Sequence, residues 1–393
     1  MERVARGYRR AEDKHLFKQA TDDPSIQPDR VTARVEGYFR APAIWIGDRP
    51  DDPSASSRNP GLRNTEALAR QLRTGIETRV MQDGTFLFDF GSWSLAPQVV
   101  IPGYRVPSPG AMHRPPVETE NASSLSERYA LLRAQAMNAH QSCLATSEWL
   151  LRGTSHGVGL PLTAADTLKG MNFVDCLRYG DGSRDIRSIY RDTWNHPVPA
   201  GTDGALQRRT LDVEVVHHSL DTFDDVLAAD NAASLIQMVE AVYLATCRYT
   251  EGRFGEAITL AWGACEQLLS KLWDSFLTET QASGRLTRQR RSRLAGRDFT
   301  ASMKSEALEL GSCLRYDLYR EVDTARKARN QWAHEMTEPS VAQLAGAMAA
   351  AEGLFEEVYG IQLRFPLNAG SPGVPAWNVW IAKDGSDREN SDR

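Results

Sequence analysis

Apolar residues recur at intervals of three and four over the C-terminal third of the chain, which is the spacing of one face of an α-helix. The pattern predicts a first helix capped at Asp230 or Asn231, because both residue types accept hydrogen bonds from the first helical turn. Proline at position 339 and glycine at position 360 are typical of the start and the end of the last helix. Short connections favour antiparallel neighbours, so we expect an up-and-down helical bundle with further helices over 253–280, 299–310, 314–332 and 339–360.

The first 120 residues carry a different pattern. Short apolar and aromatic runs alternate there with segments rich in Pro, Gly, Asp and Arg, which is typical of short strands joined by turns. Prolines at positions 107, 109, 115 and 116 predict a linker before a long helix over 124–151. We expect one helix within 64–82 and strands at 35–39, 43–46, 85–90 and 98–101.

The pattern between 152 and 225 is weak, and 213–220 is interpreted as a strand. His217 and His218 would point to opposite faces of that strand and so make a poor metal pair. The predicted fold class is therefore mainly α, with a C-terminal helical bundle preceded by an α+β N-terminal region. The expected parts are 1–122 (α+β with the Pro-rich linker, a possible sensor), 123–228 (helical or mixed), 229–362 (the bundle) and 363–393 (a tail).

The composition is that of an ordinary soluble protein, with 41% hydrophobic and 25% charged residues. A net charge of −5 argues against a protein that coats nucleic acid through its overall charge. Five scattered cysteines, with no CxxC motif, fit a reducing compartment. The N-terminus lacks the apolar segment of a signal peptide, and no run is long enough for a membrane helix. We expect a cytoplasmic protein that uses no cofactor, no metal and no membrane.

A cluster of arginines separates the second and third predicted helices. The segment RLTRQRRSRLAGR holds six arginines and no acidic residue, and we expect it to form a basic loop. Such a loop can bind a nucleic-acid backbone by charge, although arginine-rich loops are often merely solvated. The six residues are Arg285, Arg288, Arg290, Arg291, Arg293 and Arg297.

The segment RNQWAH near the end of the bundle combines a fixed cation with a histidine, a residue that exchanges protons near neutral pH. Cleavage of RNA by its own 2′-hydroxyl needs these two roles. On a helix Asn330 and His334 share one face with Arg326, while Arg329 lies about 140° from His334. The same spacing recurs at positions 10–15 and 191–196, so the setting on an amphipathic helix distinguishes this match.

With these residues in place, the region from about 230 to 361 resembles a HEPN domain, a helical module whose ribonuclease members carry an R-x4-6-H motif. The chain has the Arg-Asn-x-x-x-His version as Arg329, Asn330 and His334, after a helix with Trp262 and Glu266 and a basic segment. The resemblance covers about a third of the chain, and residues 1–225 match no family we can name.

The resemblance implies a metal-independent endoribonuclease that acts as a homodimer through this domain, with the two motifs facing one cleft. His334 and its dimer mate would transfer the protons, Arg329 would stabilise the charge on phosphorus, and Asn330 would orient the phosphate or imidazole. Glu266 and Arg326 would support these groups, and the arginine cluster would bind single-stranded RNA or tRNA. Bacterial relatives act in antiphage, abortive-infection or toxin systems, so a regulatory partner or a phage trigger is expected.

Two alternatives remain open at this point. A non-catalytic HEPN protein would use the motif to contact a nucleotide or a partner, as a binding or scaffold module. An enzyme with its chemistry in residues 1–225 would use the bundle only to dimerise. That region contains no HExxH, GxSxG or phosphate-loop motif, which weighs against the second alternative.

Overall fold

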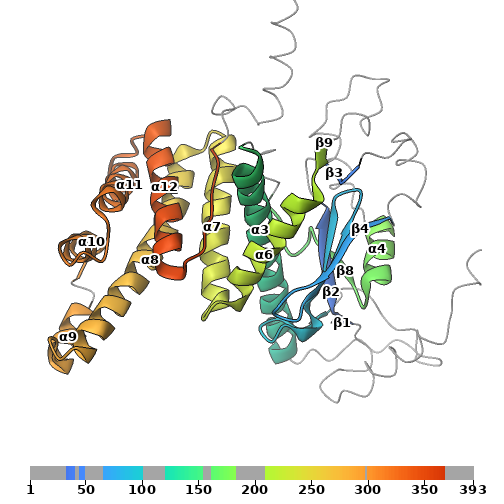
Figure 1. Cartoon of the computed structure of the whole chain (residues 1–393), viewed down its shortest axis with the longest axis horizontal. Helices are drawn as coiled ribbons and strands as arrows, with labels where there is room; N and C mark the ends of the chain where they lie inside the picture. Colours follow the sequence, from blue (N-terminus) through green and yellow to red (C-terminus); the bar gives the residue numbers. More distant parts are fainter. Residues whose placement is uncertain are drawn as a thin grey trace, which may run out of the picture.

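The computed structural model describes residues 32–39, 44–48, 65–100, 120–153, 161–182, 209–296 and 299–367. Over these residues the chain is mainly helical, with an antiparallel sheet in its N-terminal part, which confirms the predicted fold class. The elements are stacked in layers, from the sheet through α3, α6 and α7 to the C-terminal helices (Figure 1). No helix within these ranges combines the length and the apolar character that crossing a membrane requires.

Within the described residues, five strands form one antiparallel sheet in the order β4-β5-β6-β2-β8. Side chains alternate between its two faces. Tyr38 and Phe86 belong to the main core beside α3, whereas Val35 and Leu87 form a small cluster with Cys176 of α4. The strands are β2 (Val35–Phe39), β4 (Glu66–Gln71), β5 (Glu77–Met81), β6 (Thr85–Asp89) and β8 (Leu168–Gly170).

Short strand pairs lie beside the sheet. An antiparallel pair joins β1 (Thr32–Ala33) to β7 (Val99–Val100), and a parallel pair joins β3 (Ile44–Ile46) to β9 (Arg209–Leu211). These strands confirm the β character expected at 35–39, 43–46, 85–90 and 98–101.

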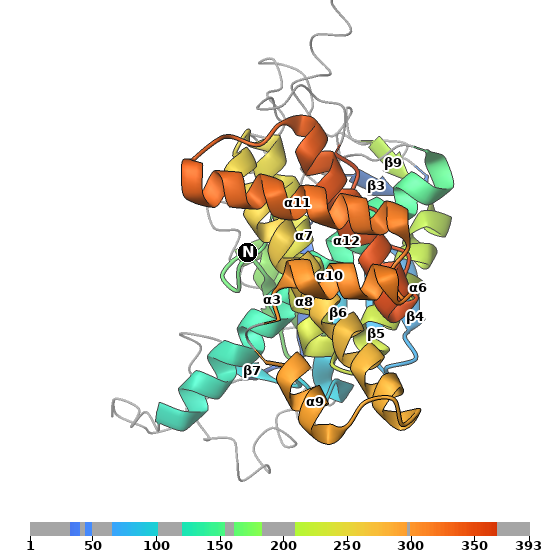
Figure 2. The same cartoon turned by 90° about the vertical axis from the view of Figure 1, so that its left-hand side faces the viewer.

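Helices pack on both sides of the sheet and then continue away from it. Figure 1 shows α4 on one face of the sheet and α3 with α6 on the other, and Figure 2 shows α10 and α11 lying across the outer side of the C-terminal helices. The helices are α3 (Glu120–Arg152), α4 (Phe173–Gly182), α6 (Val213–Ala228), α7 (Ala232–Thr250), α8 (Phe254–Ala282), α9 (Arg288–Leu294), α10 (Ala301–Leu310), α11 (Tyr316–Glu335) and α12 (Val341–Tyr359).

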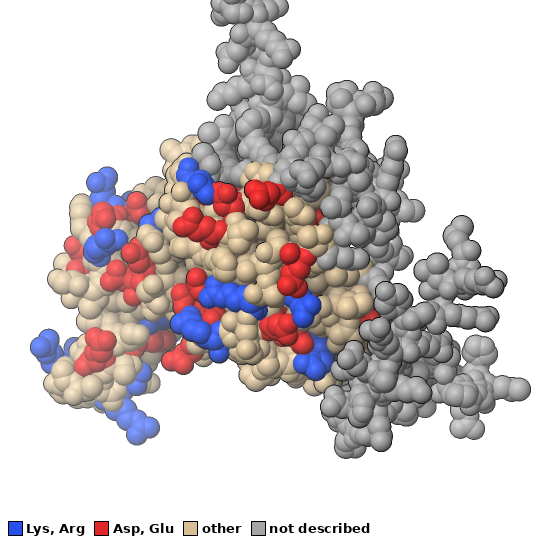
Figure 3. All heavy atoms as spheres, turned by 45° about the vertical axis from the view of Figure 1, so that its right-hand side comes forward, with Lys and Arg blue, Asp and Glu red and all other residues tan. Residues whose placement is uncertain are grey.

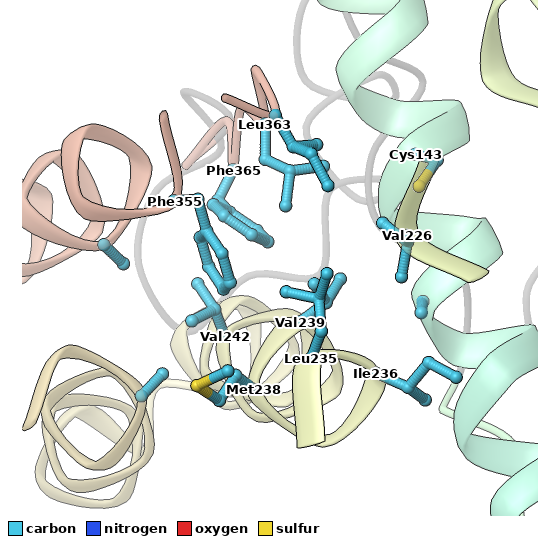
Figure 4. Close-up of a cluster of buried hydrophobic side chains, with 14 of the residues drawn as sticks. Cys143, Val226, Leu235, Ile236, Met238, Val239, Val242, Phe355, Leu363 and Phe365 are labelled. Carbon is cyan, nitrogen blue, oxygen red and sulfur yellow. The ribbon is translucent and has the colours of Figure 1, made fainter. Parts of the chain in front are cut away.

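Helix α7 is the centre of the main core. Its apolar side chains point in several directions, which is typical of a helix covered on all sides. Figure 4 shows Val242 facing Phe355 of α12 and Phe365, while Ile236 faces the α3 and α6 side. The same core therefore runs from the sheet to α12 and crosses the expected boundary between residues 228 and 229.

The start of the expected tail also belongs to this core. Leu363 and Phe365 are buried, and Thr146 of α3 donates a hydrogen bond to the carbonyl of Arg364 (2.9 Å) and accepts one from its backbone N–H (3.0 Å). Residues 361–367 thus tie α12 to α3. The rest of the tail lies outside the described residues.

The prediction of a helix within residues 64–82 is wrong. The segment forms the hairpin β4–β5, which turns at Gly75 with a φ of 85°. Strand β4 consists largely of residues that also suit helices, but pairing with β5 places Val80 in the core. Long-range pairing has overridden a local preference.

Two further expectations are wrong in the other direction. Residues 213–220, interpreted as a strand, belong to helix α6, whose buried side chains follow a helical spacing. The segment expected as a basic loop contains the short helix α9, which Thr287 caps by accepting a hydrogen bond from the backbone N–H of Arg290 (3.3 Å).

Candidate functional site

Helix α11 carries the whole Arg-Asn-x-x-x-His motif. One side of the helix is apolar and buried, through Leu318, Val322, Ala325 and Ala328. This buried stripe fixes the rotation of the helix about its axis. The polar positions between these residues therefore lie at the edge of the packed face or in solvent.

Arg329 and Asn330 form the core of the site. Nη1 of Arg329 donates a hydrogen bond to Oδ1 of Asn330 (3.1 Å), and both side chains are half-buried. The bond holds the guanidinium on the Asn330 side of the helix. It reduces the angular separation between Arg329 and His334 that the helix geometry alone predicts.

His334 lies one turn beyond Asn330 and is exposed. Its side chain makes no hydrogen bond or ion pair with another described residue. One residue past the end of the helix, Met336 takes a left-handed conformation with a φ of 53°, and its N–H donates to the carbonyl of Trp332 (3.0 Å). The imidazole is thus presented on the last turn of a terminated helix, where both ring nitrogens are open to a ligand.

Arg326 is held away from the motif histidine. Its Nη2 donates to Oδ1 of Asp323 (2.6 Å), and Lys327 binds the other carboxylate oxygen of Asp323 (2.6 Å). Burial raises the pKa of Asp323, but the hydrogen bonds from Lys327 and Arg326 outweigh this and lower that pKa below its ordinary value. The expected support from Arg326 at His334 is therefore absent, because the guanidinium points one turn back toward Asp323.

A close contact with α8 anchors the end of α11. The indole ring of Trp332 covers Gly255, where a Cβ atom would overlap the ring, and Oε1 of Glu338 accepts a hydrogen bond from the Gly255 N–H (3.0 Å). Gly255 and Glu338 were not among the residues expected at the site. The only sequence signal for this contact is a glycine in the first turn of an otherwise regular amphipathic helix.

Glu266 lies on α8 but does not reach the motif. Its side chain is exposed and forms no hydrogen bond or ion pair with Arg329 or His334. Since a helix rises about 1.5 Å per residue, Glu266 lies roughly 16 Å along α8 from the Gly255 contact that seats Trp332. The structure therefore does not bring Glu266 to the motif as expected.

The charge of α11 is balanced along its length, every residue of which is described. This balance leaves the helix without net attraction for phosphate, although single cations remain available. The acidic residues are Asp317, Glu321, Asp323 and Glu335, and the basic residues are Arg320, Arg326, Lys327 and Arg329.

The arginine cluster lies on α9 and on the turn before it, at the far end of α8. Arg291 is half-buried and donates hydrogen bonds to Gln281 (3.2 Å) and to Thr278 (3.0 Å). The other described arginines of the cluster, Arg285, Arg288, Arg290 and Arg293, are exposed, while Arg297 lies outside the described residues. Figure 2 shows α10 between α9 and α11, so the cluster and the motif are separate on the surface.

Buried titratable groups outside this site are spread through the described residues. His140 is fully buried among Phe86, Phe88 and Phe223, and its Nδ1 lies 2.7 Å from the Tyr38 hydroxyl. All five cysteines are free thiols. Among the described residues, no group of three or more His, Cys, Asp or Glu side chains is arranged to hold a metal ion.

Comparison with protein-family models, with curated proteins and with solved structures found no match for this chain.

Proposed function

We propose that the protein is a metal-independent endoribonuclease of the HEPN type. The observation that carries this proposal is the pairing of Arg329 with Asn330 one helical turn before the open imidazole of His334. A cation, an amide and a titratable ring at one helix end are the set that 2′-hydroxyl attack on a phosphodiester requires.

In this mechanism His334 accepts the proton of the 2′-hydroxyl as the oxygen attacks phosphorus. The 5′-oxygen leaves with a proton from the His334 of a second copy, and the products are a 2′,3′-cyclic phosphate and a 5′-hydroxyl. Arg329 stabilises the added negative charge on phosphorus, which is worth a few kcal/mol in comparable sites, about 2.7–4 kcal/mol for one donor. Asn330 holds the guanidinium through the observed bond and orients it.

The requirement for two histidines makes a homodimer the active form. Such an enzyme harms its host unless it is restrained, so a partner or a phage-derived trigger releases its activity. We therefore assign the protein to the effectors of antiphage, abortive-infection or toxin systems.

A non-catalytic HEPN binding or scaffold protein is the second candidate. The observation that favours it is the zero net charge of α11, because a helix that receives RNA by itself would carry an excess of cations. In this case Arg329 and His334 contact a nucleotide or a protein partner.

Cleavage of labelled single-stranded RNA and tRNA in EDTA tests the proposal. The full-length protein is compared with Arg329→Ala, with His334→Ala and with Arg320→Ala, a matched control that removes an exposed arginine from the same helix. We expect cleavage with 2′,3′-cyclic phosphate ends in the wild type and the control, and a loss of at least about a hundredfold in the two motif variants. Cleavage that survives both motif substitutions would place the chemistry elsewhere.

If the purified protein does not cleave RNA, toxicity assays in cells distinguish the two candidates. If the wild type is toxic and both motif substitutions remove the toxicity, the proposal stands, and the lack of cleavage by the purified protein is due to a missing trigger. If neither the wild type nor the variants are toxic, and cellular RNA stays intact during phage infection, the non-catalytic scaffold hypothesis is favoured over the ribonuclease.

A further inference from the structure

We infer that the arginine cluster on α9 is a separate RNA-backbone anchor, and that the protein therefore selects long or folded RNA such as tRNA over short strands. The four members of the cluster that are described and exposed carry this inference: Arg285, Arg288, Arg290 and Arg293. The binding part of this inference stands by itself, whereas its consequence for cleavage rests on the proposed function.

The cluster is uncompensated. In the described part of the chain, none of its guanidinium groups forms an ion pair, although Glu279 lies at the same end of α8. Several arginines elsewhere are neutralised by neighbours, as Arg253 is by Glu256 and Arg326 by Asp323. In Figure 3, Lys and Arg side chains project from the lobe at the lower left, where Figure 1 places α9, and acidic side chains lie on the same lobe. Arginines without ion pairs on α9 and the turn before it can bind phosphate groups.

The helix that carries the cluster is anchored by residues outside it. Nε1 of Trp273 donates a hydrogen bond to the carbonyl of Leu294 (3.1 Å), and Phe299 stacks on the Trp273 ring at 4.9 Å. Leu286 is buried at the start of the segment, and Arg291 is bonded to α8. These contacts give α9 a fixed position and leave the four exposed guanidinium groups free for a ligand.

The position of the anchor sets the length of the ligand. Trp332 of α11 sits on Gly255, at the start of α8, while Arg291 binds Thr278 near its end. At about 1.5 Å per residue these two points lie roughly 34 Å apart along α8. A stacked strand carries one phosphate per about 3.4 Å, so a stacked RNA reaches both regions when it spans about ten nucleotides.

The α9 cluster and the motif on α11 have different roles in this inference. Helix α11 has no net charge and supplies the Arg329, Asn330 and His334 set, whereas α9 and its preceding turn supply charge without any titratable group near neutral pH. An RNA that reaches both gains affinity at α9 and is positioned at α11. A short strand meets only one region at a time.

The test measures binding in full-length protein carrying His334→Ala, so that cleavage does not interfere. The probes are fluorescent tRNA and a single-stranded RNA of about three nucleotides, which is too short to span the distance even when its bases are unstacked. The variant is Arg288→Gln/Arg290→Gln/Arg293→Gln. Its matched control, Arg34→Gln/Arg79→Gln/Arg152→Gln, removes the same charge from arginines of the N-terminal half whose side chains are 45%, 40% and 47% exposed.

We expect the α9 variant to weaken tRNA binding by at least about tenfold, and the slope of log affinity against log salt to fall by roughly 2–3. The short RNA binds the parent protein more weakly than tRNA does, and the control variant binds both RNAs as the parent protein does. Unchanged tRNA binding in the α9 variant, or no tRNA binding by the parent protein, would overturn the anchor. Equal affinity of the parent protein for the two RNAs would overturn the selection of long or folded RNA.

Competition identifies the ligand class. Polyglutamate that displaces tRNA as well as unlabelled RNA does would assign the cluster to an acidic protein and overturn the inference. Because binding is measured without cleavage, an inactive wild type would count against the proposed function alone. In an active wild type, the α9 variant lowers kcat/KM for tRNA and leaves cleavage of the short RNA unchanged.

Discussion

The indole ring of Trp332 occupies the space that a Cβ atom at residue 255 would need, so α11 approaches α8 at a glycine. Glu338 reinforces the contact by accepting a hydrogen bond from the same residue's N–H (3.0 Å). His334 lies between these two anchors in the sequence. The position of the imidazole therefore depends on the absence of a side chain at Gly255, far away in the chain.

Gly255→Ala forces Trp332 to move, and we expect a loss of about 1–3 kcal/mol in the free energy of unfolding, the usual cost of overpacking. Urea unfolding followed by circular dichroism measures it. Gly263→Ala on the same helix is the matched control, because a Cβ there meets nothing within 4 Å. The control gains up to about 1 kcal/mol from helix propensity. Equal stability of the two variants would show that Trp332 adapts without cost.

Asp323→Asn releases Arg326 and Lys327 and gives α11 a net positive charge. We expect a short RNA to bind this variant more tightly, with a slope against salt that is steeper by roughly 0.7. Fluorescence anisotropy at several salt concentrations measures both. Asp317→Asn removes the same charge from an exposed position on the same helix. If both variants tighten binding equally, bulk charge and not the released Arg326 is responsible.

Glu352 makes stability depend on pH. Its Oε1 accepts a hydrogen bond from the Phe365 N–H (2.7 Å), but burial outweighs this and raises the pKa of Glu352 above its ordinary value of 4.5. The folded state thus favours the protonated form. Its stabilising contribution is complete below the ordinary value and is lost as pH rises through the folded value.

Thermal unfolding between pH 7 and pH 4 tests this sign. We expect the wild type to gain stability relative to Glu352→Gln as the pH falls, because glutamine keeps the acceptor without the charge. Glu356→Gln, an exposed position one turn further along α12, serves as the control and keeps the wild-type pH dependence. Parallel curves for the wild type and Glu352→Gln would contradict the assignment.

Glu36→Gln leaves a buried cation without its partner. Arg133 and Glu36 are both fully buried and lie 3.2 Å apart, and burial lowers the pKa of Arg133. We expect a loss of about 3–5 kcal/mol in the free energy of unfolding. Arg152→Gln breaks an exposed ion pair with Asp212 and costs at most about 1 kcal/mol. A small effect of Glu36→Gln would mean that water or a rearranged side chain compensates Arg133.

The sequence by itself determined the C-terminal helices and the placement of the motif. The periodicity of Leu318, Val322 and Ala325 is a local signal, since each residue marks the same side of one helix. Pro339 and Gly360 predict the bounds of the last helix; the structure begins it directly after Ser340, which forms a capping box, and ends it at a left-handed Gly360. These features depend on neighbours within one or two turns and can be recognised without the rest of the fold.

Only the tertiary structure decided how these elements pack and which side chains from different elements contact one another. It turned β4 into a strand because β5 pairs with it, and it seated Trp332 on Gly255. It also paired Arg326 with Asp323 in an ion pair, placed Glu266 away from the motif, and placed α9 at the far end of α8. Contacts between residues distant in sequence depend on how whole elements pack, and a spacing rule along one helix carries no information about them.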